Sequence, residues 1–443
     1  MKRILFKKSL AVLCVAGLFA ACGEPEEDPD NQDNQNQENH NQENHNDHQV
    51  DHPFEDCTTS FEAQDDPEDN RVAIVNALVE AEPGDILCFN DGTYELHSEL
   101  QIRTDNLEIR GQSRDGVILD FTNQDDGSNG LDGQDVSDLQ IRSLTVLNTP
   151  GNGIEVRRGD GLVFDDLAVL WESENDPDNG DYGIYPVNSE NVIIENSLVV
   201  GASDAGIYLG QSVHGVIRNN ETHGNVASIE IENSSYIDVY GNHAHDNTGG
   251  ILAFNLVGLD RKRGDNVRIF DNLVENNNRE NFAGGSGIIR LVPSGTGVLV
   301  IGMQKVEVFD NDIIDHRSVG IAALTYDSLD LFLDDYDPED GYYMYAEQIF
   351  VHDNTIDDAG YSPRGVATQI VDIDPIPAIL WDGVINEEKA AEEPEEEWRN
   401  CFLDNVDSDG NPVTYANVSE DDENPVDPGD NECTGFSPEP VDL

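Results

Sequence analysis

The stretch from Tyr182 to Phe254 repeats one pattern, and this repeat constrains the fold more than any other feature. Each repeat begins with a small residue, alternates apolar and polar residues, and later reaches an Asn or Ser at a turn. The repeats begin at Gly183, Gly206, Ser228 and Gly250, spaced 23, 22 and 22 residues apart. Alternation with a period of two predicts strands. A repeat of this length predicts a solenoid in which each repeat forms one coil of three short strands.

An asparagine recurs at a fixed distance from the start of the coil. The distance is 14 residues from Gly206 to Asn220, and it is longer where a coil carries an insertion. If the coils stack in register, these asparagines form a ladder whose amides hydrogen-bond from coil to coil. The predicted ladder contains Asn220, Asn242, Asn272, Asn311 and Asn354. The preference of Asn for turns is the alternative explanation, but five matches at one position favour the ladder.

Three segments carry a resemblance to a known family: Tyr182 to Pro186 (YGIYP), Ser203 to Tyr208 (SDAGIY) and Ile229 to Ser235 (IEIENSS). They resemble the pectate-lyase-like superfamily, and the resemblance extends from Gly84 to Asp382. It implies an all-β fold, a right-handed parallel β-helix with three strands in each coil. Within this superfamily the sequence is similar to exported bacterial β-helix proteins of unestablished activity. These proteins are often encoded beside a second exported protein, which is therefore a candidate partner.

The alternation predicts one column of inward-pointing apolar residues: Ile154, Val156, Ile184, Ile207, Leu209, Ile229, Ile231, Ile251, Val298, Val300 and Ile321. The ends of such a column need caps, because the last coil would otherwise expose its core and strand edges. Apolar residues at near-helical spacing predict a capping helix from Asn70 to Ala81, which Pro83 stops. The other cap is expected at the C-terminal end. The predicted β-helix domain covers residues 57–383, and an acidic cap or tail covers residues 384–443.

The first 21 residues have the form of an export signal, with basic residues before an apolar run too short to span a bilayer. The sequence LFAACG around Cys22 resembles a bacterial lipobox, which implies cleavage before Cys22 and a lipid on its thiol. An ordinary signal peptide is the alternative. Residues 22–56 contain almost no apolar side chains and are expected to form a disordered linker. Because Gly23 follows the cysteine where an inner-membrane retention signal would have Asp, an outer-membrane lipoprotein is expected.

The charge balance limits the partners. The chain has 91 acidic and 23 basic residues, a net charge of −68. This charge excludes nucleic acid as a partner, because polyanions are repelled. Acidic polysaccharides would need bridging divalent cations. Contact with the membrane is expected only through the lipid.

Besides Cys14 and Cys22 the chain has four cysteines, an even number that predicts disulfides in an exported protein. Three pairings are open. We favour Cys57–Cys88 and Cys401–Cys433, because each pair brackets one end of the solenoid. No Cys/His spacing typical of a zinc site is found.

The outer face of the first strand of each coil is the candidate binding surface. The residues two before, two after and four after the start glycine are expected to be exposed there: Asp181, Tyr185, Asp204, Tyr208, Glu155, Arg157, Glu230 and Glu232. Coils ~4.7–4.9 Å apart would stack Asp181 on Asp204 and Tyr185 on Tyr208. Tyrosine faces pack on sugar rings, and carboxylates bind hydroxyls or a bridging Ca²⁺. The alternative is that Tyr is a favourable strand residue and that acidic residues are common throughout this chain.

We therefore expect polysaccharide binding, with a structural or partner-docking scaffold as the alternative. A polysaccharide lyase or epimerase is the third hypothesis. No catalytic residue is assigned, because the Asp-Pro-His, Gly-His-Gly and Arg-x-Pro-x-x-Arg motifs of known β-helix enzymes are missing. Asn405, Asp407 and Asp409 match the first half of a calcium loop, but Ala416 stands where the closing Glu belongs, so a plain turn is the competing interpretation. Four insertions are expected to form loops at the edges of the face: 171–181, 256–265, 276–296 and 326–345.

Overall fold

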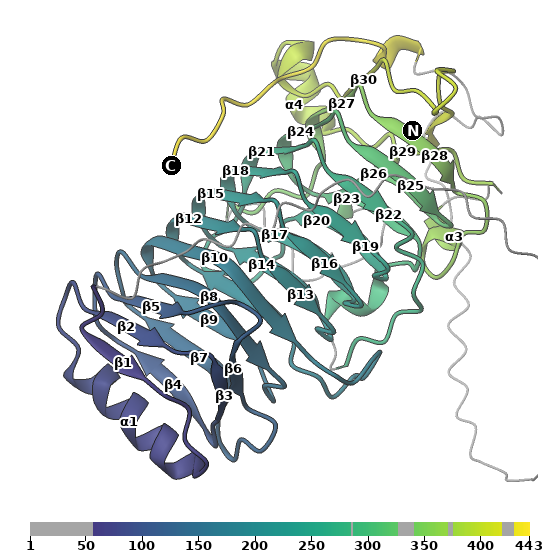
Figure 1. Cartoon of the computed structure of the whole chain (residues 1–443). Helices are drawn as coiled ribbons and strands as arrows, with labels where there is room; N and C mark the ends of the chain where they lie inside the picture. The colour runs from purple at the N-terminus through teal and green to yellow at the C-terminus, as the bar shows by residue number, and fades with distance from the viewer. Residues whose placement is uncertain (1–55, 285–286, 327–340, 371–374, 419–428) are drawn as a thin grey trace, which may run out of the picture. The chain divides into compact units, whose positions relative to one another are not determined.

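The computed structural model describes residues 56–284, 287–326, 341–370, 375–418 and 429–443. The predicted signal, Cys22 and nearly all of the predicted linker lie outside these residues. The named strands pair in parallel and stack into three columns that run from one end of the domain to the other (Figure 1). The fold is therefore the predicted parallel β-helix. Among the described residues, no helix is long and apolar enough to cross a membrane.

One column is an 11-stranded sheet that contains the first strand of each coil, and we call it the first-strand sheet. Its strands are β4 (Ser98–Ile102), β7 (Asp126–Gln134), β9 (Ile154–Arg157), β11 (Tyr182–Val187), β14 (Ala205–Gly210), β17 (Ala227–Glu232), β20 (Gly249–Phe254), β23 (Thr296–Ile301), β26 (Val319–Leu324), β29 (Ile379–Trp381) and β31 (Tyr415–Asn417). Side chains alternate between the interior and the outer face of this sheet.

The other two columns share one 20-stranded sheet, because the long strands β8 and β10 belong to both. The second strands are β1 (Thr59–Phe61), β2 (Ile86–Phe89), β5 (Glu108–Gly111), β8 (Gln140–Leu147), β10 (Asp160–Leu170), β12 (Glu190–Glu195), β15 (Val213–Arg218), β18 (Ser235–Tyr240), β21 (Asp265–Phe270), β24 (Gln304–Phe309), β27 (Glu347–His352) and β30 (Cys401–Leu403). The third strands are β3 (Gly92–Glu95), β6 (Val117–Asp120), β13 (Leu198–Val200), β16 (Glu221–His223), β19 (His243–His245), β22 (Leu273–Glu275), β25 (Asp312–His316) and β28 (Thr355–Ala359).

The interior is the predicted apolar column. Ile184 pairs with Ile154 on one side and with Ile207 on the other, and the same register continues through the later coils. All eleven predicted inward residues are buried. Burying such a side chain contributes about 1.5–3 kcal/mol, so the column is the main source of stability.

The asparagine ladder is also confirmed. In each of the five, the side-chain amide donates to the amide oxygen of the next, with N···O distances of 2.8–3.0 Å, and the series continues to Asn405. A second ladder, which we did not predict, joins Asn225, Asn247 and Asn277 at the next turn. Both ladders satisfy turn amides in the interior, where an unpaired polar group would be destabilising.

Both ends of the solenoid carry caps (Figure 1). Helix α1 (Pro67–Glu80) begins three residues before the predicted start, because Asp66 accepts from the Glu68 amide and a proline occupies the first turn. Disulfides join Cys57 to Cys88 and Cys401 to Cys433, the pairing that the sequence favoured. The remaining helices are short: α3 (Ala367–Ile370), α4 (Glu387–Glu392), and the 3₁₀ turns η1 (Ile288–Leu291), η3 (Glu395–Glu397) and η5 (Gly429–Asn431).

Candidate functional site

The outer face of the first-strand sheet changes character along its length. One register column reads Asp132, Glu155, Tyr185, Tyr208, Glu230, Leu252, Leu299, Ala322 and Leu380. The column is charged at its N-terminal end, aromatic in the middle and apolar beyond Glu230. The predicted tyrosines and acids therefore meet in the coils of β9 to β17, as the sequence analysis placed them.

Three tyrosines form the centre of this face, one more than the sequence analysis named. The rings of Tyr182 and Tyr185 stack with centroids 4.5 Å apart and an interplanar angle of 8°. Tyr208 lies against both, at 4.9 and 4.7 Å. Simple alternation from Ile184 would turn Tyr182 inward.

Gly183 explains why Tyr182 faces outward. A Cβ at Gly183 would lie 2.3 Å from Cγ1 of Val199, so this position points into the core and only glycine fits. Gly183 and Ile184 are therefore consecutive inward positions, and the alternation shifts by one residue at the start of the strand. The offset between Tyr182 and the start glycine was the signal that could have identified it.

Burial corrects the expectation that this face is open. Tyr208 is 3% exposed, Glu230 3% and Glu232 8%, while Tyr182 and Tyr185 remain half-buried. Tyr208 belongs to a second hydrophobic cluster that includes residues of the insertions: Val257, Phe282, Tyr326 and Tyr342. These insertions thus cover the middle of the face, where the sequence analysis expected them only to wall its edges.

Three carboxyl groups lie among the tyrosines, and burial changes their chemistry. Burial raises the pKa of Asp204 to about 7, although a hydrogen bond from the Tyr182 hydroxyl, 3.1 Å from Asp204 Oδ2, opposes the rise. Burial likewise raises the pKa of Glu232 to about 7, against a hydrogen bond with Tyr208. Burial, and then the charges of Asp204 and Glu232, raise the pKa of Glu230 well above its ordinary value.

Two oxygens of this carboxyl cluster are buried without a partner. Neither Asp204 Oδ1 nor Glu230 Oε1 has a hydrogen-bond partner among the described residues. A buried polar atom without a partner is destabilising. Perturbed carboxyls with unused hydrogen-bonding capacity are typical of functional sites. Within the cluster, Asp204 and Glu232 can hold and release protons near neutral pH.

In the N-terminal part of the face, the polar side chains bond to one another. Glu155, which was expected to be exposed, is 6% exposed and accepts from Asn129, Asn152 and Arg157 at 2.7, 2.9 and 2.7 Å. Arg157 also donates to Asp132 at 2.9 Å. The Arg157 side chain is 38% exposed and Asp181 is exposed, so these two predicted residues remain accessible.

The weak calcium candidate has the geometry of a turn. The side-chain amide of Asn405 belongs to the asparagine ladder. Its oxygen accepts from Asn354, and its nitrogen donates to the Val351 carbonyl at 2.9 Å. The Asp407 carboxylate accepts from the backbone amides of Asp409 and Asn411 at 3.0 and 2.8 Å. These contacts match the competing interpretation of a plain β-turn.

The insertion at residues 256–265 contains a basic segment, Arg261 to Arg263, that contacts the rest of the protein. Arg261 donates to the Ser235 hydroxyl at 2.7 Å. Arg263 lines a cavity of about 880 Å³ with Gln304, Tyr343 and residues of α4, including acidic ones.

Comparison with known proteins agrees with this fold. Residues 173–332 match the family described as the right handed beta helix region. The protein is a right-handed parallel β-helix. No curated protein sequence matches the chain.

Solved structures with a similar chain path have low sequence identity to this β-helix. One is a mannuronan C-5 epimerase A-module from Azotobacter vinelandii, with 15% identity over 80% of this chain and 92% of that one, at a TM-score of 0.43. A polygalacturonase from Erwinia carotovora has 12% identity over 69% and 94%, at 0.42. An endo-xylogalacturonan hydrolase from Aspergillus tubingensis has 16% identity over 68% and 91%, at 0.41. At these scores the likenesses carry no argument about function.

Proposed function

We propose that this β-helix binds a polysaccharide on the outer face of its first-strand sheet, in the coils of β9 to β17. The observation that carries the proposal is the stacked pair Tyr182 and Tyr185, half-buried beside Asp204. Aromatic surfaces pack on the C–H faces of sugar rings. Asp204 fixes this pair, because its Oδ2 accepts a hydrogen bond from the Tyr182 hydroxyl at 3.1 Å.

The accessible residues define where the sugar lies. Tyr208, Glu230 and Glu232 are buried, so they support the tyrosine pair and do not contact the ligand in this arrangement. Tyr182, Tyr185, Asp181 and Arg157 retain exposed surface and form the binding edge. A purely structural scaffold is the alternative, and the burial of Tyr208 favours it over an open sugar groove.

Binding is tested with a glycan array probed with the full chain. The Tyr182→Ala/Tyr185→Ala variant should weaken binding to the selected glycan by about tenfold or more, since a buried aromatic face contributes about 1–2 kcal/mol. Tyr236→Ala is the matched control, because Tyr236 is 45% exposed on the second-strand side. Equal affinity of the double variant and the control, with circular dichroism unchanged, would exclude this site. Absence of binding to any glycan would favour the scaffold.

Acid–base catalysis on the bound glycan is a second candidate. The pKa of about 7 for Asp204 favours it, because a group that titrates near neutral pH can both donate and accept a proton. Mass spectrometry of the glycan after incubation would reveal a lyase by shortened chains with an unsaturated end. Epimerisation leaves the mass unchanged, so NMR of the glycan is needed to detect it. A glycan unchanged by both methods leaves a binding protein.

We also infer a lipid-anchored place in the cell envelope, from the lipobox-like sequence around Cys22. The linker that follows would hold the β-helix away from the membrane. Cys22→Ala should move the protein from the membrane fraction to the soluble fraction. Unchanged fractionation would mean that the anchor lies elsewhere.

A further inference from the structure

A second polar cluster lies on a different face, where the third strands β16, β19 and β22 run side by side. Parallel pairing places Glu221 beside His243, and His223 beside His245. The next coil places Glu275 beside His245. Residues two apart on a strand face the same side. The sequences Glu-Thr-His and His-Ala-His therefore put one carboxylate and three imidazoles on one small patch.

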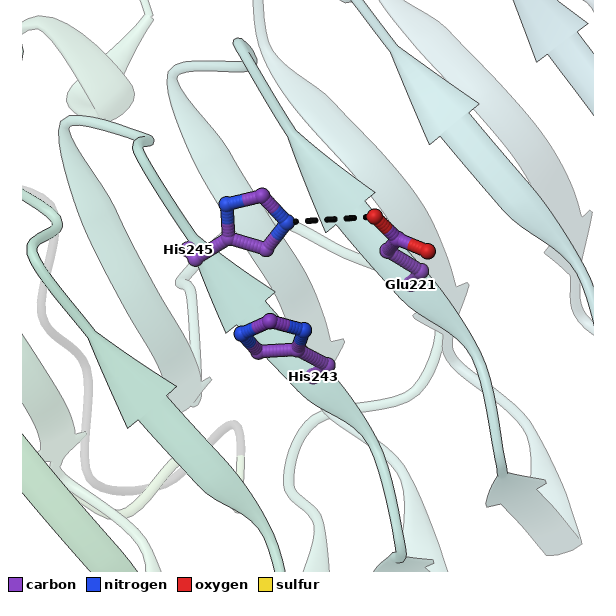
Figure 2. Close-up of side chains that lie close together, drawn as sticks. All are labelled: Glu221, His243 and His245. Carbon is purple, nitrogen blue, oxygen red and sulfur yellow. Dashed lines mark hydrogen bonds and ion pairs between the residues drawn. The ribbon is translucent and has the colours of Figure 1, made fainter. Parts of the chain in front are cut away.

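The side chains of this patch converge. One ligand atom from each of Glu221, His243 and His245 lies within 4.8 Å of the other two. Figure 2 shows both imidazoles beside the Glu221 carboxylate, with the contact between His245 and Glu221 marked. The ring centroids of His243 and His245 are 4.1 Å apart. Within the ranges that the structure describes, no other group of His, Cys, Asp or Glu side chains comes together in this way.

Neighbouring carboxylates hold the two imidazoles in place. Asp246 Oδ2 lies 2.8 Å from His245 Nδ1, and Glu275 Oε1 lies 2.8 Å from His243 Nε2. His245 thereby directs Nε2 toward Glu221, at 3.3 Å. A carboxylate that bonds one nitrogen of an imidazole and leaves the other free is the usual support of a metal-bound histidine.

Hydrogen bonds and ring stacking alone could also explain this patch. Acidic residues are common on the surface of this protein, so carboxylates near one another carry no information. The two histidines do, because the whole chain has only 11 and two of them converge here on one carboxylate. Imidazole nitrogen with carboxylate oxygen is a typical ligand set for zinc.

We propose that Glu221, His243 and His245 bind a Zn²⁺ ion on the third-strand face. Bonds of about 2.0–2.2 Å in tetrahedral geometry require ligand atoms about 3.3 Å apart, so the side chains must move together slightly. They can do so because the Glu221 side chain is 54% exposed and the two histidines are not fully buried. Three protein ligands leave a fourth position open toward solvent, for water or an exchangeable anion. This site is separate from the proposed glycan face and does not depend on it.

The test is equilibrium dialysis of the full chain against Zn²⁺, with the bound metal counted by elemental analysis. The linker contains His40, His45, His48 and His52, which could bind zinc loosely. The parent for this experiment is therefore the full chain with these four histidines changed to Gln. We expect the parent to bind one equivalent of Zn²⁺. His243→Gln/His245→Gln should weaken its affinity by about 100-fold or more, since two of three ligands are lost.

The matched control is His97→Gln in the same parent. His97 Nε2 lies 3.1 Å from Glu95 and is partly exposed, so it is a His–Glu pair without a third ligand. This variant should retain the bound zinc. Zinc should also raise the Tm of the parent and of His97→Gln, but not of His243→Gln/His245→Gln. Loss of the site without misfolding is established if all three have the same Tm and circular dichroism in the absence of metal.

Substitution with Co²⁺ identifies the ligands independently. A tetrahedral His₂Glu site should give visible absorption bands that disappear in His243→Gln/His245→Gln and weaken in Glu221→Gln. The proposal is overturned if the parent binds no zinc, or if the double variant binds it as tightly as His97→Gln does.

Discussion

Two sets of buried polar side chains run along the solenoid, and they differ in whether their polar atoms find hydrogen-bond partners. The asparagine ladder lies in the interior at a turn, and each of its amides both donates and accepts. The outer face of the first-strand sheet carries carboxyl groups, which as ions can only accept. Asp204 and Glu230 keep unpartnered oxygens there, whereas the ladder amides are paired.

The difference lies in the chemistry of the side chain and not in the depth of burial. Asn272 and Glu230 are both nearly inaccessible, at 2% and 3% exposure. Stacked amides are complementary to copies of themselves, so a repeat can bury them indefinitely. Carboxylates cannot pair with one another in this way. Burial raises the pKa values of Asp204, Glu230 and Glu232, and the charges of Asp204 and Glu232 raise that of Glu230 further. The ladder amides use one another as hydrogen-bond partners. The carboxyl groups of the outer face do not, and functional sites typically contain such groups.

Exchanging an amide for a carboxylate inside the ladder should produce the largest effect. Asn272 Nδ2 donates to Asn311 Oδ1 and to the Val239 carbonyl, both at 2.9 Å. Asn272→Asp would turn two buried donated bonds into contacts between acceptors. We expect the free energy of unfolding at pH 7 to fall by about 3–5 kcal/mol, measured by urea denaturation.

Asn188→Asp is the control for that substitution. Asn188 also occupies a turn, with φ of 53°, but it is exposed. The same added charge should change stability by less than about 0.5 kcal/mol there. If the free energy of unfolding falls equally in both variants, the ladder amides do not stabilise the stacking of the coils.

The reverse exchange on the outer face should stabilise the protein. The pKa of Asp204 is about 7 in the folded chain and about 4 in the unfolded chain. Between these values the unfolded chain releases a proton that the folded chain keeps, so stability falls as pH rises from 4 to 7. Asn at this position does not titrate. The free energy of unfolding of Asp204→Asn relative to wild type should therefore rise by about 1–3 kcal/mol as the pH increases from 4 to 8.

Urea denaturation at several pH values measures this gain, with Asp181→Asn as the control. Asp181 neighbours Asp204 in the adjacent coil but is exposed. Its variant should follow the wild-type pH dependence closely. A flat difference between Asp204→Asn and wild type across this range would contradict the raised pKa.

What the sequence could predict follows from the same contrast. The ladder and the inward column repeat with the coil, so spacing alone located Asn242 and Ile207. Tyr208 is buried in a cluster that also contains Tyr326 and Tyr342, residues of a long insertion that does not follow the coil period. Tyr182 was missed because Gly183 shifts the alternation. Glu221 and His243 lie 22 residues apart, which is one coil, so the coil period places them side by side.

The smallest expected effect is that of Glu230→Gln. Burial, and then the charges of Asp204 and Glu232, raise the pKa of Glu230 well above its ordinary value, which favours the neutral acid in the folded protein. Gln has nearly the same shape and no charge, and stability should change by less than about 1 kcal/mol. Glu155→Gln is the matched control on the same face. Glu155 is similarly buried, but it forms an ion pair with Arg157. That control should lose about 1–3 kcal/mol in the same urea titration, since it removes the ionised acceptor of Arg157 Nη1 and leaves Arg157 paired only with Asp132. A gain of stability in Glu230→Gln would mean that Glu230 is ionised in the folded protein and that its neighbours do not neutralise its charge. A loss equal to that of the control would mean that the Glu230 carboxylate accepts a stabilising contact.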